Sequence, residues 1–217
     1  MGTTTAASTA TAPQGRGRGG RERILVAAAR LFAIQGINAT GMEQVAEEAP
    51  VSKRTLYAHF RTKGDLVIAH LQDLASSGAT LESVLTREDV PPRERILGLF
   101  DPPPGDTASA DTASANAAPK DAAPVRGCPF IDAAAEFPDP RNAVHSYARE
   151  QKLRMVDLVT ALVEELGVRE PTALAEQLVT LADGAASRAM VLGEADYGRH
   201  ARAAAEILLA HAAADTP

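Results

Sequence analysis

The sequence predicts an all-α protein in which a small N-terminal domain of three helices, a helix-turn-helix, precedes a larger helical domain. Two observations support this prediction. Apolar residues make up 45% of the 217 residues, and aromatic residues only 4%. Much of the apolar content is alanine, which favours helix and close contacts between helices. Apolar residues also recur at helical spacing in successive segments that begin at Ser, Thr or Pro and end at Gly or Pro.

The first two helices are predicted at residues 21–35 and from Thr40 onward. The inward positions of the first helix are Ile24, Leu25, Ala28, Leu31 and Phe32, and Gly36 ends the helix. Thr40 and Glu43 match a capping box, in which each side chain accepts a hydrogen bond from the backbone amide of the other residue. The second helix should end before Pro50, because the residue that precedes a proline avoids helical geometry.

The third and fourth helices are each predicted from a capping residue. Ser52 begins the third helix, and Thr62 begins the fourth, with Asp65 in its first turn at the positive end of the helix dipole. Leucines at helical spacing carry the fourth helix to about Thr86, and Gly78 is a place where it can bend.

The rest of the chain predicts five more helices and one long loop. The helices are expected near residues 93–100, 133–137, 142–166, 171–192 and 196–213. Residues 101–124 hold no large apolar side chain and predict a disordered loop. The expected organisation is a disordered N-terminal arm (1–20), a helix-turn-helix domain (21–66) and a larger helical domain (67–217).

Charge is distributed unevenly between the two ends of the chain. Residues 1–64 hold nine Lys or Arg and four Asp or Glu, a balance of +5, while residues 65–217 hold 13 and 24, a balance of −11. These two values sum to the net charge of −6. A basic head on an acidic body is typical of a protein that docks one end on the phosphates of a nucleic acid.

The helix that begins at Ser52 holds the groups expected to contact DNA. Lys53, Arg54 and Tyr57 lie on its early, outward part, where a recognition helix touches base edges and phosphates. Arg and Lys pair with guanine edges or phosphates, and a tyrosine hydroxyl donates to a phosphate. His59 and Lys63 lie where the backbone of the duplex would pass.

The run from Val51 to Leu66, VSKRTLYAHFRTKGDL, resembles the recognition-helix signature of the TetR family of bacterial regulators. Leu31-Phe32 with Gly36, and the run from Met42 to Glu47, are similar to the two preceding family helices. The resemblance implies a repressor that binds double-stranded DNA as a homodimer at a palindromic operator and is released by a small molecule. It makes residues 21–66 the DNA-binding domain and residues 67–217 the ligand-binding and dimerisation domain. It places the DNA contacts at Thr40, Lys53, Arg54, Tyr57, His59 and Lys63.

Two further features bear on this resemblance. Pro50 stands where many family members have glycine, and we expect this difference to shift the angle between the second and third helices and to affect base contacts more than phosphate contacts. Residues 126–130 and 133–138 are similar to a block in the ligand domains of one TetR subgroup. We expect dimerisation through the alanine-rich faces of the last two helices, and effector contacts at Phe130, Phe137, His145 and Met155.

Alternative interpretations stay open at this point. The body could serve dimerisation alone without a ligand, or could be a helical enzyme joined to a DNA-binding head, although no catalytic set of residues is visible and no enzyme activity is expected. Arg16, Arg18 and Arg21 could form an arm that enters the minor groove, or only a solubilising tail. Cys128 could be a small semi-buried residue or a thiol sensor.

Several classes of protein are not indicated by the sequence. The five histidines show no metal-ligand spacing, and we expect neither a metal nor a cofactor. A single cysteine, no signal-like start and no long apolar run predict a cytoplasmic protein with no membrane partner.

Overall fold

The computed structural model describes residues 18–77, 81–101, 127–193 and 197–214. Over these ranges the chain forms ten α-helices and one 3-10 turn, without a strand, so the prediction of an all-α fold is confirmed. The elements are α1 (Arg18–Gln35), α2 (Met42–Glu48), α3 (Lys53–His59), α4 (Lys63–Ser76), α5 (Leu81–Leu85), α6 (Pro92–Leu97), η1 (Gly98–Phe100), α7 (Pro129–Glu136), α8 (Ala143–Glu165), α9 (Pro171–Leu192) and α10 (Tyr197–Ala214).

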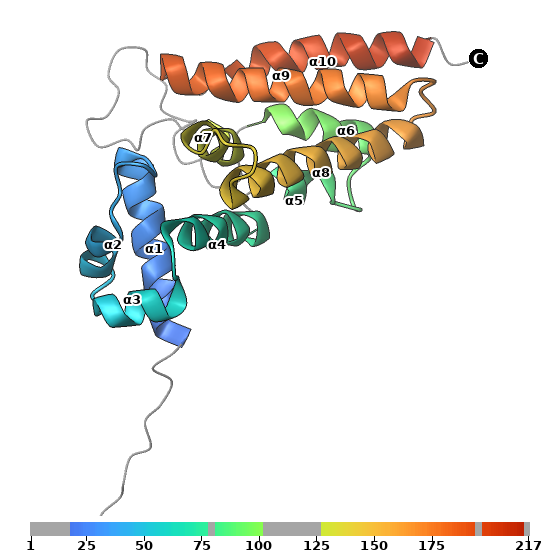
Figure 1. Ribbon diagram of the computed structural model, residues 1–217. Coiled ribbons are helices and arrows are strands. Elements are labelled where there is room, and N and C mark those ends of the chain that lie inside the picture. Colours follow the sequence, from blue (N-terminus) through green and yellow to red (C-terminus); the bar gives the residue numbers. More distant parts are fainter. Residues whose placement is uncertain (1–17, 78–80, 102–126, 194–196, 215–217) are drawn as a thin grey trace, which may run out of the picture.

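Helices α1 to α4 form a head at one end of the molecule (Figure 1). The buried side chains of α1 meet Val45 of α2, Leu56 of α3 and Leu66 of α4, and each of these three is at most 1% exposed. Gly36 ends α1 with a positive φ of 85°, which glycine adopts without steric cost. Helix α1 begins three residues earlier than predicted.

The fourth predicted helix is two helices in the structure. Thr62 and Asp65 form a complete capping box at its start, as the Thr62 hydroxyl accepts from the Asp65 amide at 3.1 Å and the Asp65 carboxylate accepts from the Thr62 amide at 2.9 Å. The helix stops at Ser76, and α5 begins at Leu81, so one continuous helix to residue 86 was wrong. The break brackets Gly78, where the sequence indicated a bend; residues 78–80 lie outside the described ranges.

The body is built on α8, α9 and α10: α8 packs against α9, α9 packs against α10, and the last two helices lie on the side away from the head (Figure 1). Asn142 caps α8, and Pro171 opens α9 at its first position, where the sequence predicts that a helix begins. Their buried faces meet α6 and η1 in a core whose members include Ile96, Val159 and Leu178, each fully buried. The predicted loop 101–124 lies outside the described residues except Asp101.

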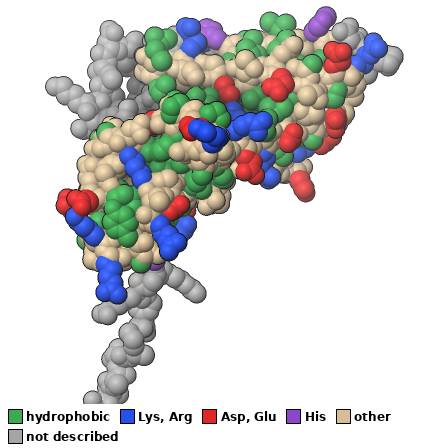
Figure 2. Space-filling view, in the orientation of Figure 1, with side chains coloured by type: hydrophobic (Ala, Val, Ile, Leu, Met, Phe, Trp, Pro, Cys, Tyr) green, Lys and Arg blue, Asp and Glu red, His purple; other side chains and the backbone are tan. Residues whose placement is uncertain are grey.

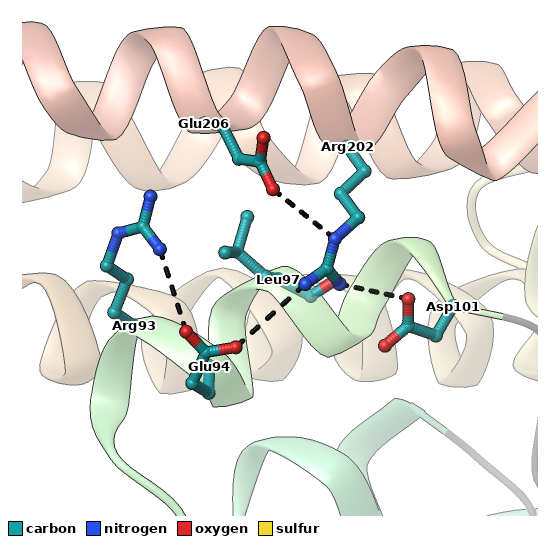
Figure 3. Close-up of polar contacts among 6 residues, drawn as sticks. All are labelled: Arg93, Glu94, Leu97, Asp101, Arg202 and Glu206. Atoms are coloured by element: carbon teal, nitrogen blue, oxygen red, sulfur yellow. Dashed lines mark hydrogen bonds and ion pairs between the residues drawn. The ribbon is translucent and has the colours of Figure 1, made fainter.

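Helix α10 is held on α6 and η1 by a close backbone approach and by Arg202 (Figure 3). A Cβ added at Gly198 would lie 2.1 Å from the carbonyl oxygen of Phe100, so only glycine fits there. The Arg202 guanidinium donates to the carbonyl of Leu97 at 3.0 Å and to the Asp101 carboxylate at 2.9 Å, and Glu206 lies 3.4 Å from its Nε. These contacts fix the last helix relative to the centre of the body.

Two hydrophobic cores divide the described chain, and the boundary between them does not follow chain order. The head core runs from Ile24 to Leu71 and also includes Ala133 of α7 and Val144 of α8. The second core begins at Leu85 and lies wholly in the body. Helix α7 and the first turn of α8 therefore pack with the head, although the sequence assigned them to the ligand-binding domain.

Candidate nucleic-acid interface

Helix α3 starts at a side-chain cap and separates a buried face from an exposed one. The Ser52 hydroxyl accepts a hydrogen bond from the Thr55 amide at 3.1 Å, which confirms the predicted cap. Leu56 is fully buried beneath the helix, whereas Lys53 and Arg54 are exposed and Tyr57 is 46% exposed. We call these three exposed side chains the reading face.

The reading face is positively charged and lies at the free end of the head. Lys and Arg side chains gather on the part of the surface where Figure 1 places α3 (Figure 2). Lys53 is paired with Glu43 of α2, and this hydrogen bond raises the pKa of the Lys53 ammonium group. Because both side chains are more than half exposed, the pair is weak and can open toward a phosphate.

The N-terminal end of α1 packs against the C-terminal end of α3. A Cβ at Gly20 would lie 3.2 Å from Nε2 of His59, and the Arg21 guanidinium lies 5.7 Å from the centre of the Phe60 ring. His59 is therefore partly buried against α1 rather than fully free for DNA. Arg21 belongs to a helix and is not part of a flexible arm, and Arg18 begins that helix.

The turn between α2 and α3 explains why glycine suits the place of Pro50. The Val51 amide donates to the Ala46 carbonyl at 3.0 Å, which is the hydrogen bond that closes a helix through a left-handed residue. Pro50 is that residue, with a φ of 24°, whereas the proline ring prefers a φ near −65°. The turn has the geometry for which glycine is best suited, and proline adopts it under strain.

Thr40 is buried and does not cap α2, which corrects the predicted capping box. It is 1% exposed, and its hydroxyl donates to the Gly36 carbonyl at 2.8 Å while accepting from the Gln35 side chain at 3.1 Å. Gly41, rather than Thr40, caps α2, and no side chain completes a capping box there. The Thr40 hydroxyl is held in the α1–α2 turn, and its contact with DNA stays a prediction.

Lys63 lies at the head–body junction, where its ammonium group donates to the Asn38 carbonyl at 3.0 Å. Partial burial lowers the pKa of Lys63, and the nearby Glu136 carboxylate opposes this effect. An ammonium group has three donors, so two remain for a phosphate.

The four residues predicted to contact an effector are not brought together. Phe130 and Phe137 pack against the head core, and Nδ1 of His145 lies 2.9 Å from the Phe137 carbonyl oxygen. Met155 packs against the body core instead, and its sulfur lies 3.5 Å from the Lys152 ammonium group. The first three mark the junction of α7 with α8, and Met155 lies deeper in the body.

Other kinds of site gain little support from the described residues. Burial raises the pKa of the Cys128 thiol, which disfavours the thiolate that a sensor needs. No three His, Cys, Asp or Glu side chains in the described ranges are grouped to hold a metal ion. None of the helices described has the length and apolarity needed to span a bilayer.

Sequence reasoning missed the partners of two acidic residues, Glu43 on α2 and Glu136 on α7. Glu43 was assigned only to a cap, although a carboxylate ten residues before Lys53 could have suggested an ion pair between α2 and α3. Glu136 accepts hydrogen bonds from the turn after α1, about a hundred residues away in sequence, and no local pattern indicates this contact.

Comparison with known proteins matches this arrangement. A model described as bacterial regulatory proteins, tetR family, matches residues 24–70. The HTH-type transcriptional activator FasR of Mycolicibacterium smegmatis is 44% identical over 52 residues, so this chain spans about a quarter of that relative's length. The HTH-type transcriptional regulator YjdC of Escherichia coli is 27% identical over 194 residues, 87% of this chain and 93% of its own.

Solved structures share the whole architecture. The crystal structure of a TetR-family transcriptional regulator from Streptomyces coelicolor superposes with a TM-score of 0.70 at 27% identity, covering 90% of this chain and 97% of that chain. The likeness therefore extends over both the head and the body.

Proposed function

This chain belongs to the TetR family and is a DNA-binding transcriptional regulator that acts as a dimer, and we propose that it is a repressor which a small-molecule effector releases from a palindromic operator. Regulators of this family are transcription factors and not enzymes, so an enzymatic body is set aside. The observation that carries the proposal is the reading face: two cations and a phenol exposed on the capped helix α3, whose opposite side is anchored by the buried Leu56.

We assign contact roles from exposure and chemistry. Arg54 reads base edges, because a guanidinium pairs with two acceptors of guanine at once. Lys53 leaves Glu43 for a phosphate or a base, and the Tyr57 hydroxyl donates to a phosphate. His59 and Lys63 approach the backbone from the margins of the reading face, each with part of its surface already engaged.

We propose that two copies pair through α9 and α10, as the sequence predicted. An open groove between these helices is lined mainly by apolar atoms, with Gln177, Thr180 and Ile207 among its residues, and Ile207 is 71% exposed. A Cβ at Gly184 would meet nothing within 4 Å, so this glycine has no packing reason within one copy. An exposed glycine inside a helix costs about 1 kcal/mol relative to alanine, which a close partner backbone would justify. We call Gln177, Thr180, Gly184 and Ile207 the pairing face.

The regulatory step follows from the two surfaces together. Pairing places two copies of α3 in successive major grooves, about 34–36 Å apart. An effector that binds the body more tightly at another head separation removes the dimer from DNA, by no more than its differential affinity.

We propose that the effector contacts the body near α7 and α8. Phe130, Phe137 and His145 lie at the junction of these helices, where a displacement would reach the head core. Beside Met155, Lys152 and Asp183 form an ion pair whose side chains are only 22% and 29% exposed. This pair offers a polar anchor for a mainly apolar ligand.

Activation is a second candidate because a relative that is 44% identical over 52 residues is named an activator. The same contacts to DNA serve either outcome, and the position of the operator decides between them. An operator that overlaps the polymerase site supports repression, while one upstream of it supports activation.

Selection of genomic DNA fragments bound by the full-length protein tests the proposal. We expect recovered fragments to share an inverted repeat whose half-sites are about one helical turn apart, or a multiple of it. Arg54→Ala should enrich these fragments poorly under the same conditions. Recovery of unrelated fragments at background frequency would overturn the proposed operator recognition.

A further inference from the structure

The body holds the DNA-binding head through a carboxylate that clasps the turn after α1. Glu136, the last residue of α7, accepts hydrogen bonds from the backbone amides of Ile37, at 2.9 Å, and Asn38. The Asn38 side-chain amide returns a bond to the Glu136 carbonyl at 3.3 Å. Three hydrogen bonds therefore join one body residue to one turn of the head.

The turn is shaped to receive an anion. Gly36 has a positive φ of 85°, and the next two amides point to the same carboxylate, an arrangement of successive backbone donors that binds negative charge. A Cβ at Gly36 would lie 3.5 Å from the Glu136 carboxylate oxygen, so the contact is close. Lys63 completes the clasp from the other side by bonding the Asn38 carbonyl at 3.0 Å.

The clasp stands next to an apolar seam between the same elements. Ala133 of α7 and Val144 of α8 are buried in the head core, at 0% and 1% exposure. A Cβ at Gly64 would lie 3.7 Å from a methyl group of Val144, which brings the first turn of α4 against α8. The apolar seam is not directional, whereas hydrogen bonds to two successive amides fix an orientation.

The turn that is clasped leads directly into the helix-turn-helix. Thr40 and Gln35 hold the residues between α1 and α2 through hydrogen bonds. Val45 of α2 and Leu56 of α3 are buried together in the head core. A displacement at α7 therefore reaches α3 through packed and hydrogen-bonded groups.

We propose that Glu136 is a positioning residue that fixes the angle of the reading face relative to the body, and so sets the separation of the two heads in the dimer. The inference rests on the proposed function, since it concerns how two heads reach neighbouring grooves. Glu136 touches no DNA, and it acts through the turn at residues 36–38. A change in the body that moves α7 would alter head separation by moving this carboxylate.

The first test concerns the contact and needs no DNA. We compare backbone amide exchange in the intact protein with Glu136→Ala and Glu136→Gln, and use Glu164→Gln, an exposed body carboxylate, as the charge-matched control. Protection of Ile37 and Asn38 should fall about tenfold in Glu136→Ala and less in Glu136→Gln, which keeps one acceptor oxygen. Unchanged protection in Glu136→Ala would overturn the clasp.

The second test concerns positioning. The protein carries Cys128→Ser as background and a spin label at Glu47→Cys. In the free dimer, the distribution of label-to-label distances should be broader for Glu136→Ala than for Glu164→Gln. Operator affinity should fall about tenfold with an unchanged salt slope, because no phosphate contact is lost. Loss of thermal stability with an unchanged distance distribution and unchanged affinity would reduce Glu136 to a structural contact and overturn the proposal.

The two proposals fail separately. If the parent protein selects no operator but Glu136→Ala still broadens the head separation, the proposed operator recognition fails and the positioning role stands. If the parent binds its operator and Glu136→Ala matches it in both separation and affinity, only the positioning role is lost.

Discussion

The reading face and the pairing face are both exposed in one copy of the protein, and their chemistry is opposite. The reading face offers two cations and a phenol above a buried leucine. The pairing face offers two uncharged polar side chains and an isoleucine that is 71% exposed, which line a groove of mainly apolar atoms, together with an exposed glycine on α9. Exposure alone therefore does not tell what a surface binds.

Because their chemistry differs, the two faces should bind their partners through different forces. Contacts to phosphates release counterions, so binding through the reading face weakens as salt rises. Burial of apolar area at the pairing face depends little on salt, and small side chains allow two backbones to approach. The two faces should then respond separately to substitution and to ionic strength.

The largest expected effect comes from placing a charge on the pairing face. Ile207→Asp buries a carboxylate without a partner, so the dimer should dissociate and operator affinity should fall by about a hundredfold or more as one half-site is lost. Sedimentation velocity and fluorescence anisotropy measure the two quantities. The control is Leu153→Asp on α8, where the side chain is 43% exposed. If Ile207→Asp stayed dimeric, the two copies would not pair through the pairing face.

A smaller effect is expected from loosening α10, the helix that carries Ile207 of the pairing face. Gly198→Ala places a methyl group 2.1 Å from a backbone oxygen of η1, which cannot rotate away. The free energy of unfolding should fall by about 1–3 kcal/mol, while preference among operator sequences stays unchanged. Urea unfolding measures the change, with Gly19→Ala as control because its added Cβ meets nothing within 4 Å. Equal stability of the two variants would contradict the close approach of α10 to η1.

The phenol of the reading face should contribute modestly. Tyr57→Phe removes one hydroxyl donor while keeping the ring, so affinity should fall about two- to tenfold. Because a phosphate contact carries no base identity, strong and weak operators should lose affinity by the same factor. A loss confined to one operator sequence would instead assign Tyr57 to a base edge.

The smallest effect concerns the turn beneath the reading face. Pro50→Gly relieves a proline held at a φ of 24°, and part of this gain is offset by the greater freedom of the unfolded chain. The net result should be a rise of about 0.5–1 kcal/mol in the free energy of unfolding, measured by urea titration. A decrease would mean that the proline is not strained in this turn.

Local chemistry made part of this structure predictable. The caps at Ser52 and Thr62 depend on side chains within three residues of the amides that they satisfy, so sequence spacing was sufficient. The same pattern failed at Thr40, because the Gly36 carbonyl and the Gln35 side chain hold its hydroxyl inside the turn. A capping motif shows that a side chain is able to cap a helix, and the groups around that side chain decide whether it does.

Contacts between distant segments could not be predicted. The bond from the Ile37 amide to Glu136 spans 99 residues, and the packing of α7 on the head crosses a predicted domain boundary. For the same reason the sequence grouped Met155 with Phe130, although the structure assigns them to different cores. The roles of individual residues toward DNA and effector stay predictions, and exposure supports those of Lys53, Arg54 and Tyr57.

The most direct measurement of the central claim is operator binding by Arg54→Ala and Lys63→Ala over a range of salt concentrations and operator variants. We expect Arg54→Ala to relax discrimination between operators, at a cost of about 1–3 kcal/mol, and Lys63→Ala to reduce the salt slope by about one for all sequences alike. If both variants bound every operator as the parent does, α3 would not be the helix that reads DNA.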